Sequence, residues 1–242
     1  MVNKRVELGK NTMQGRKKPT PYNPLVVEPT EVIKRRWLSE GAFEVELSRP
    51  QHFQFKAGHT IQLIYQDEKR YYSLASAPGD PTLVLCVNFI EKGYFSPLLA
   101  SAEIGFSLEF TGPHGYFTFS PSPRPPVFIA TDTGIAPFVS MARSGIRDFT
   151  LLHGARLAEE LYYQDLLQEC THKYLPIVWE IPDGEQVSSD LFHGKMVNLL
   201  AQHLKPGRYD FYLCGWQKMI KDVTHLIDDR FPGSHVYTEV FY

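Results

Sequence analysis

An arginine, two aromatic residues and a hydroxyl follow one another in Arg70-Tyr71-Tyr72-Ser73-Leu74-Ala75-Ser76-Ala77-Pro78. In an extended segment side chains i and i+2 share a face, so Arg70 and Tyr72 should point one way and Ser73 the other. Arginine holds a pyrophosphate through two parallel charge-assisted hydrogen bonds, and tyrosine lies flat on a ring system. A dinucleotide flavin needs such a set of contacts. An ordinary edge strand with a surface arginine fits the same short pattern, so the rest of the chain must distinguish a flavin-binding segment from such a strand.

Composition and charge exclude several classes of protein. The 242 residues are 43% hydrophobic and 21% charged, typical of one large or two medium globular domains. A net charge of −2 argues against a nucleic-acid partner. Cys86, Cys170 and Cys214 form no C-x-x-C pair, so we expect no zinc site and no locally wound iron–sulfur loop. Sparse cysteines, no apolar run near the ~20 residues of a membrane span and no signal-peptide core predict a cytoplasmic protein without a membrane partner.

The chain divides into four parts. Residues 1–24 are basic and poor in apolar residues, which predicts a surface arm. From 25 to 120, short alternating runs such as Phe43, Val45 and Leu47, punctuated by glycine and proline, predict an antiparallel barrel or sandwich. The segment 121–126 belongs to a stretch too rich in proline for a helix or central strand, and we interpret it as a linker.

From 127 to 242 five apolar strands alternate with amphipathic helices. This order predicts right-handed βαβ units and a five-stranded parallel sheet, with ligands bound at the carboxyl ends of the strands. Thr133-Gly134 opens a helix at the end of the first of these strands, where the helix N-terminus would attract a pyrophosphate. Cys214-Gly215 ends the fourth strand, and Cys214 there is either a cleft residue or simply a small buried hydrophobe.

Six motifs in order now resemble one family. They are Arg70-x-Tyr72-Ser73, Gly93-x-x-Ser96, Gly112-Pro113-x-Gly115-x-Phe117, Thr133-Gly134-Ile135-Ala136-Pro137, Cys214-Gly215 and a C-terminal Glu239 with aromatic neighbours. Over residues 28–242 the chain resembles the ferredoxin–NADP⁺ reductase superfamily. The resemblance implies a Greek-key FAD-binding β-barrel followed by an NAD(P)-binding α/β domain. It also implies hydride transfer through FAD between NAD(P)H and a separate ferredoxin, flavodoxin or oxygenase component.

The resemblance implies a role for each matching position. Arg70 would hold the flavin pyrophosphate, Tyr72 would lie against the isoalloxazine, and Ser96 would help bind the flavin phosphate. Ser73 would hydrogen-bond near the flavin N5, whereas Cys214 and Glu239 would line the nicotinamide pocket, and these three would form the catalytic set. The cofactor-binding residues expected in this way are Arg70, Tyr71, Tyr72, Ser73, Val87, Asn88, Gly93, Tyr94, Phe95, Ser96, Thr133, Gly134, Arg156, Cys214, Gly215, Phe241 and Tyr242.

Departures from the family pattern leave alternatives open. Asp132 stands where the family usually has glycine, and a carboxylate there would repel a pyrophosphate. A flavin-binding redox or regulatory subunit with impaired nucleotide binding is therefore an alternative to a reductase, as is the reductase component of an oxygenase system. Arg156, or Lys195, would grip the 2′-phosphate of NADPH, but NADH is not excluded. The basic arm and the nearby Lys34-Arg35-Arg36 would steer an acidic carrier protein, unless the arm is only a solvated tail.

Overall fold

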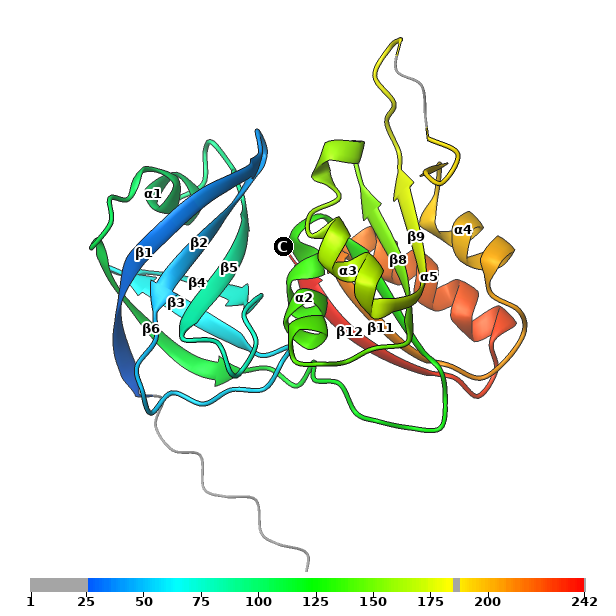
Figure 1. Cartoon of the computed structure of the whole chain (residues 1–242), viewed down its shortest axis with the longest axis horizontal. Coiled ribbons are helices and arrows are strands. Elements are labelled where there is room, and N and C mark those ends of the chain that lie inside the picture. The colour runs from blue at the N-terminus through cyan, green and yellow to red at the C-terminus, as the bar shows by residue number, and fades with distance from the viewer. Residues whose placement is uncertain (1–25, 185–187, 242) are drawn as a thin grey trace, which may run out of the picture.

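Two domains lie side by side in the computed structural model, a strand-rich barrel and a sheet covered by helices (Figure 1). The structure describes residues 26–184 and 188–241. The expected basic arm, residues 1–24, and Tyr242 lie outside the described residues.

Six strands form the first domain as one antiparallel sheet, in the order β4-β3-β6-β1-β2-β5. The sheet curls until its edges meet, because Leu74, directly after β4, bridges Leu85 of β5. The antiparallel barrel predicted from the alternating pattern is confirmed. Its strands are β1 (Val27–Ser39), β2 (Ala42–Ser48), β3 (Thr60–Tyr65), β4 (Glu68–Ser73), β5 (Thr82–Asn88) and β6 (Ser107–His114), and one helix, α1 (Phe95–Ser101), follows β5.

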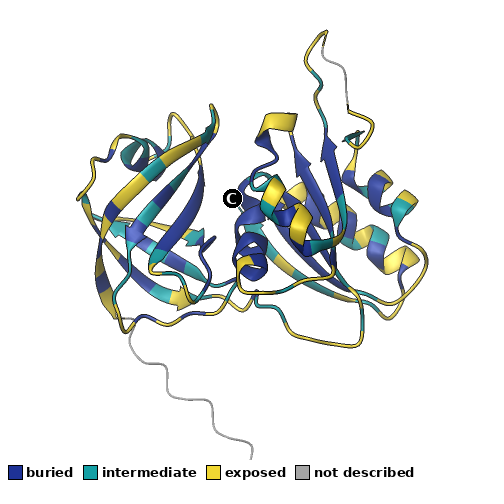
Figure 2. Ribbon diagram, in the orientation of Figure 1, coloured by how far each residue is buried: buried dark blue, intermediate teal, exposed yellow. Residues whose placement is uncertain are grey.

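The alternation of the barrel strands sets which side chains fill the interior. Phe43, Val45 and Leu47 of β2 have no exposed surface, whereas Glu44 and Glu46 between them are only partly buried. Side chains of a strand point alternately to its two faces, so every second residue joins the barrel core. Figure 2 shows the result as alternating buried and exposed bands along the barrel strands.

All strands of the second domain are parallel, in the order β10-β9-β8-β7-β11-β12. The chain runs outward from β7 in one direction and then returns to the other side of it, so the topological switch point lies between β7 and β11. The parallel sheet is confirmed, with the two-residue β10 added to the five strands that the sequence predicts. The strands are β7 (Pro126–Thr131), β8 (Phe149–Ala155), β9 (Thr171–Val178), β10 (Phe192–His193), β11 (Asp210–Trp216) and β12 (His235–Phe241).

Helices cover both faces of this sheet (Figure 1). Phe128 and Ala130 of β7 pack on the side of α2 and α3, whereas Val127 and Ile129 pack on the side of α4 and α5. A strand covered on both faces is apolar at every position, which explains the continuous apolar run Val127–Ala130. The helices are α2 (Ala136–Arg143), α3 (Gln164–Cys170), α4 (Met196–His203) and α5 (Gln217–Arg230), with 3₁₀ turns η1 (Asp132–Ile135) and η2 (Ala158–Glu160).

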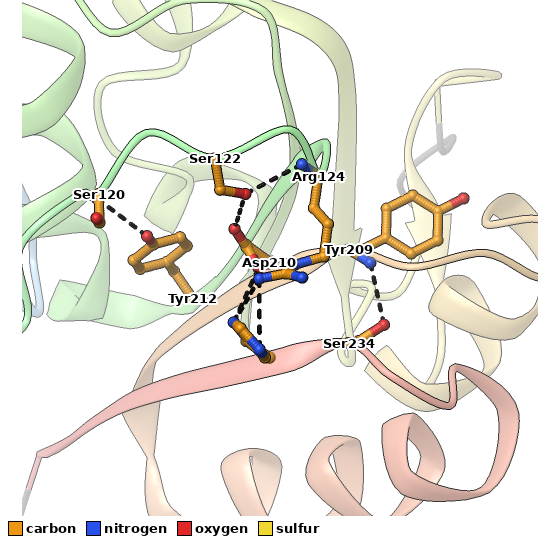
Figure 3. A network of polar contacts seen from close by, with 8 residues as sticks. Ser120, Ser122, Arg124, Tyr209, Asp210, Tyr212 and Ser234 are labelled. Carbon is orange, nitrogen blue, oxygen red and sulfur yellow. Dashed lines mark hydrogen bonds and ion pairs between the residues drawn. The ribbon is translucent and has the colours of Figure 1, made fainter. Parts of the chain in front are cut away.

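The proline-rich connection between the domains is fixed to the amino ends of β11 and β12 (Figure 3). Ser122 Oγ donates a hydrogen bond to Asp210, and Arg124 Nε donates a second one at 2.6 Å. Burial alone would raise the pKa of Asp210, but these two hydrogen bonds, together with the charges of Arg124 and His235, hold the pKa below its usual range. The predicted linker 121–126 lies in this connection, and Pro126 is the first residue of β7, where a missing N–H breaks no sheet hydrogen bond.

Helix α2 joins the two domains. Its Ser140 Oγ donates to the Ser76 carbonyl of the barrel at 2.6 Å, and Arg143 forms an ion pair with Asp80 at 2.9 Å. One apolar cluster contains barrel residues such as Cys86 together with α2 and the central strands of the parallel sheet. The domains therefore share a core, which fixes the geometry of the cleft between them.

Candidate active site

A cleft of about 820 Å³ lies between the barrel and the carboxyl ends of the parallel strands, within the size range of small-molecule sites. Strand β4 and the β5–α1 loop form its barrel side, whereas η1 and β12 close it from the other domain. This is the position predicted for a ligand from the switch point between β7 and β11. The lining residues are Thr60, Gln62, Glu68, Lys69, Arg70, Tyr71, Tyr72, Ser73, Cys86, Asn88, Ile90, Gly93, Tyr94, Phe95, Ser96, His114, Gly115, Thr133, Ala136, Glu239, Val240 and Phe241.

Strand β4 presents consecutive residues to the cleft. Arg70, Tyr71, Tyr72 and Ser73 all line it, so residues from both faces of the strand reach the cleft. The reason is that β4 is an edge strand joined to β5 only at the bridge of Leu74, so the cleft reaches both of its faces. Burial raises the pKa of Tyr72 well above its usual value, which keeps its hydroxyl protonated.

The turn before α1 is held by its own serine. Ser96 Oγ accepts a hydrogen bond from the Ile90 N–H at 2.9 Å and donates one to the Ile90 carbonyl at 3.1 Å. A Cβ on Gly93 would lie only 3.1 Å from that carbonyl oxygen, so glycine fits this turn best. Ser96 therefore shapes the loop that carries Gly93, Tyr94 and Phe95 into the cleft.

Strand parity separates two of the predicted residues. Asn88 and Cys86 of β5 line the cleft, whereas Val87 between them is 2% exposed and belongs to the barrel core. Successive side chains of a strand point to opposite faces. Val87 thus supports the site from behind and does not reach it.

Glu239 and Ser73 meet across the domain boundary inside the cleft. Ser73 Oγ donates a hydrogen bond to Glu239 Oε1, which joins β4 of the barrel to β12 of the other domain. Burial raises the pKa of Glu239 to about 7, although the Ser73 hydrogen bond opposes this rise. Glu239 therefore exchanges a proton near neutral pH, which is what general acid–base chemistry requires.

The Cys214 side chain does not line the cleft. It has no exposed surface, and burial followed by the neighbouring Glu239 raises its thiol pKa well above the usual value. Cys214 and Glu239 are paired in register on β11 and β12. The thiol is thus a neutral group packed behind the carboxylate.

Gly134 and Gly215 allow two backbone segments to touch. A Cβ on Gly134 would lie 2.6 Å from the Cys214 carbonyl oxygen, and one on Gly215 would lie 2.3 Å from Thr131 Oγ1. Gly215 also has a φ of +126°, a conformation that side chains disfavour. These glycines bring the ends of β7 and β11 together, while Thr133 lines the cleft beside them.

Asp132 and Arg156 lie at the carboxyl ends of β7 and β8 and do not line the cleft. Asp132 has a φ of +51°, which explains why glycine suits this position; aspartate is one of the few other residues that adopts it readily. Burial, followed by the carboxylate of Glu160, raises the pKa of Asp132 to about 6. The Arg156 guanidinium donates hydrogen bonds to Glu160 and Glu180.

The basic run Lys34-Arg35-Arg36 is largely compensated within the barrel. Lys34 lies 3.6 Å from Glu46, and Arg36 pairs with Glu44 at 2.5 Å. Arg35 donates to the Ala102 carbonyl at 2.7 Å and so ends α1. Two of the three cations are thus paired with carboxylates, whereas Arg35 contacts neutral carbonyl groups.

Sequence reasoning missed several lining residues. Gln62 and Thr60 of β3 lie opposite Tyr71 and Ser73 in the strand register, so pairing β3 with β4 would have found them. His114 ends β6 and meets the Tyr71 ring edge-on at 5.3 Å. Burial lowers the pKa of His114, against a hydrogen bond with Thr111 that raises it.

The cleft fits FAD in size and in chemistry. Lys69 and Arg70 provide cations, Tyr71, Tyr72 and Tyr94 provide aromatic rings, and Ser73 provides a hydroxyl, all along one wall. No group of three or more possible metal ligands occurs in residues 26–184 and 188–241. Across that same part of the chain, every helix is too short or too polar to cross a membrane.

Two family profiles divide the chain in the same way as the structure. The profile of the oxidoreductase FAD-binding domain matches residues 30–119, and that of the oxidoreductase NAD-binding domain matches residues 128–225. The first covers the barrel and the second covers most of the parallel sheet.

Individual proteins agree with these profiles. The chain is 32% identical over 208 residues to ferredoxin–NADP reductase B of Sorangium cellulosum, covering 77% of this chain and 85% of that protein. It is 27% identical to the 2-halobenzoate 1,2-dioxygenase electron transfer component of Burkholderia cepacia, covering 72% of this chain but only 54% of that protein. The fold matches a ferredoxin NADP⁺ reductase of Neisseria gonorrhoeae, solved with FAD and NADP, at a TM-score of 0.77 and 22% identity, over 89% of this chain and 99% of that one. The chain belongs to the ferredoxin–NADP⁺ reductase superfamily of FAD- and NAD(P)-dependent oxidoreductases.

Proposed function

We propose that this protein is a flavoprotein reductase that passes electrons between NAD(P)H and a separate one-electron carrier, a ferredoxin or flavodoxin. FAD, when bound, supplies the redox chemistry by exchanging a hydride with the nicotinamide and single electrons with the carrier. The observation that carries the proposal is the Ser73–Glu239 hydrogen bond, which places a proton-exchanging carboxyl where the two domains meet inside the cleft. Three buried free cysteines support work in the reducing cytoplasm.

The barrel residues would bind and orient the flavin. Arg70 would hold the pyrophosphate, and Tyr71 and Tyr72 would bound the ring system. Ser96 would act by holding the loop of Gly93, Tyr94 and Phe95 in place, since its own hydroxyl is engaged with Ile90.

The residues of the α/β domain would receive the nicotinamide. Thr133 would contact the nucleotide from η1, and Phe241 would lie on the flavin face that the nicotinamide must reach. Glu239 would hold or release a proton at its Oε1, with Ser73 as its partner, and Cys214 would position Glu239 from behind.

The test is anaerobic mixing of the purified yellow protein with NADH and with NADPH. We expect the flavin absorbance to bleach, and the reduced protein then to reduce a ferredoxin or flavodoxin. A protein that carries FAD but is reduced by neither nucleotide would instead be a flavin-binding redox or regulatory subunit, an alternative that Asp132 favours. Protein without bound flavin would contradict both.

A reductase component of an oxygenase system is the second candidate, because the Burkholderia cepacia relative is such a component. It would share every residue of the cleft. Rates of electron transfer to a ferredoxin, a flavodoxin and an oxygenase component, compared under one set of conditions, separate the two.

A further inference from the structure

Arg156 is paired with two carboxylates. Its Nη2 donates to Glu160 at 3.0 Å, and its Nη1 donates to Glu180 at 3.2 Å. The backbone reinforces this pairing, because the Glu180 N–H donates to the Arg156 carbonyl at 3.0 Å. Glu180 is thus fixed beside the end of β8 although it follows β9 in the chain.

Glu160 is held more firmly than a surface carboxylate. Its Oε2 accepts the Leu157 N–H at 3.0 Å, and its side chain is only 12% exposed. A carboxylate fixed by both a backbone N–H and a guanidinium does not leave the arginine readily. An anion added beside Arg156 would therefore lie close to carboxylates that repel it.

A third carboxylate lies close by on η1. Asp132 and Glu160 interact electrostatically, and so do Asp132 and Arg156. The group therefore combines three carboxylates with a single guanidinium, and its net charge is negative at neutral pH.

The position of this group relates it to nucleotide choice. In doubly wound sheets the pyrophosphate binds at the turn after the first strand, and the ribose 2′ position is recognised about twenty residues later, after the second strand. Asp132 and Thr133 form the first turn here, and Arg156 follows the second strand. A 2′-hydroxyl can donate hydrogen bonds to carboxylates, whereas a 2′-phosphate must compete with them for Arg156 and is repelled by them.

We infer that Glu160 and Glu180 make this enzyme select NADH over NADPH by pairing with Arg156 and repelling a 2′-phosphate. The inference rests on the proposed function and deepens it by naming the nucleotide. It also reverses the role that the sequence predicts for Arg156, from a partner of the 2′-phosphate to a bridge between carboxylates.

Calorimetric titration of the FAD-loaded full chain with ADP-ribose and with 2′-phospho-ADP-ribose tests the inference without hydride transfer. We expect ADP-ribose to bind at least about tenfold more tightly to the wild type. Glu180→Gln keeps the shape of the side chain but removes one of the carboxylate charges beside Arg156. It should lower the preference for ADP-ribose over 2′-phospho-ADP-ribose about threefold or more. Glu159→Gln is the matched control, because the Glu159 carboxylate is exposed in the same turn and makes no ion pair or side-chain hydrogen bond among the described residues.

Every outcome of this titration supports or overturns the inference. Equal or tighter binding of 2′-phospho-ADP-ribose by the wild type would overturn the inference, as would a ratio that Glu180→Gln and Glu159→Gln change equally. Binding of neither compound would overturn it together with the nucleotide site. Selective ADP-ribose binding without flavin reduction by NADH would support the selectivity and contradict the reductase function.

Discussion

The barrel side of the cleft and the neighbouring nucleotide side, at the carboxyl ends of β7 and β8, differ in charge. On the barrel side Lys69 and Arg70 line the wall beside Glu68, so cations prevail. Just outside the cleft, at the carboxyl ends of β7 and β8, Arg156 interacts with the carboxylates of Asp132, Glu160 and Glu180, so carboxylates prevail. A site that retains an anionic cofactor gains from fixed cations, whereas a site that must release an anionic reactant after each turnover gains from holding it weakly.

Glu239 lies between these two sides, and its charge follows neither of them. It comes from the α/β domain, but its hydrogen-bond donor is Ser73 of the barrel. Burial makes it neutral below a pH of about 7 and charged above it. The charge of the cleft centre therefore depends on pH, whereas the charges of the two walls are set by ion pairs and exposed cations.

Replacing the central carboxyl should have the largest effect. Glu239→Gln removes the group that exchanges a proton, and we expect hydride transfer to slow on the order of 100-fold. In the wild type the protonated form prevails below a pH of about 7, so a rate that needs it should fall as pH rises through 7. The glutamine variant should show no such inflection in stopped-flow rates, and an inflection that persists would assign the titration to another group.

Arg70→Ala should remove a cation from the barrel side and weaken the binding of FAD there. Loss of a charge-assisted partner of the pyrophosphate should weaken FAD binding about thirtyfold, since such hydrogen bonds contribute about 1.5–3 kcal/mol. Equilibrium dialysis of the flavin measures this. Lys34→Ala is the control, because Lys34 is an exposed cation of the same barrel that does not line the cleft. Equal flavin retention in both variants would show that Arg70 does not hold FAD.

Asp132→Gly should make the nucleotide side less negative and so reduce its difference in charge from the barrel side. Removing a carboxylate should tighten NADH binding about fivefold at pH 7.5, and glycine accepts the φ of +51° without strain. Wild-type binding should also tighten as pH falls through about 6, because Asp132 then becomes neutral between Glu160 and Arg156. The glycine variant should lack this pH dependence in a flavin-difference titration. A variant that binds NADH no better would exclude Asp132 as a source of repulsion.

Phe241→Ala tests the aromatic residue that lines the cleft from β12. A ring stacked on the flavin must be displaced by the nicotinamide, and such a stack is worth about 0.5–1.5 kcal/mol beyond its buried area. We therefore expect NAD⁺ and NADP⁺ to bind about threefold more tightly to the variant, and product release to slow. Weaker binding of both nucleotides would mean that the ring only packs against the sheet.

The sequence predicts most of the fold because its signals are local. Alternation in β2, the apolar run of β7 and the prolines of residues 121–126 each reflect the backbone of a few neighbouring residues. The two-residue β10 carries no periodicity, so nothing in its sequence distinguishes it from a loop. Parity within a strand is equally local, and in β5 it separates the buried Val87 from Asn88 in the cleft.

The candidate site depends on contacts between distant residues, and these are harder to predict. Ser73 and Glu239 are 166 positions apart, and only the resemblance to a family suggested that they belong together. The sequence shows Arg156 as a cation at the end of a strand, but its pairing with Glu180 depends on how β9 ends beside β8. Charge at a position is visible in a sequence, whereas its neutralisation by a neighbour on another strand is not.

The place of β12 at the edge of its sheet has a consequence for the motions of the site. β12 pairs only with β11 in its sheet, and none of its residues His235–Phe241 is fully buried. Local opening of a protein begins where few buried contacts must be broken. Backbone amides of β12 should therefore exchange with deuterium sooner than those of β11, and Ser73→Ala should speed that exchange by removing the hydrogen bond that ties Glu239 to the barrel. The carboxyl at the centre of the cleft is thus carried by a segment whose opening equilibrium the barrel itself controls.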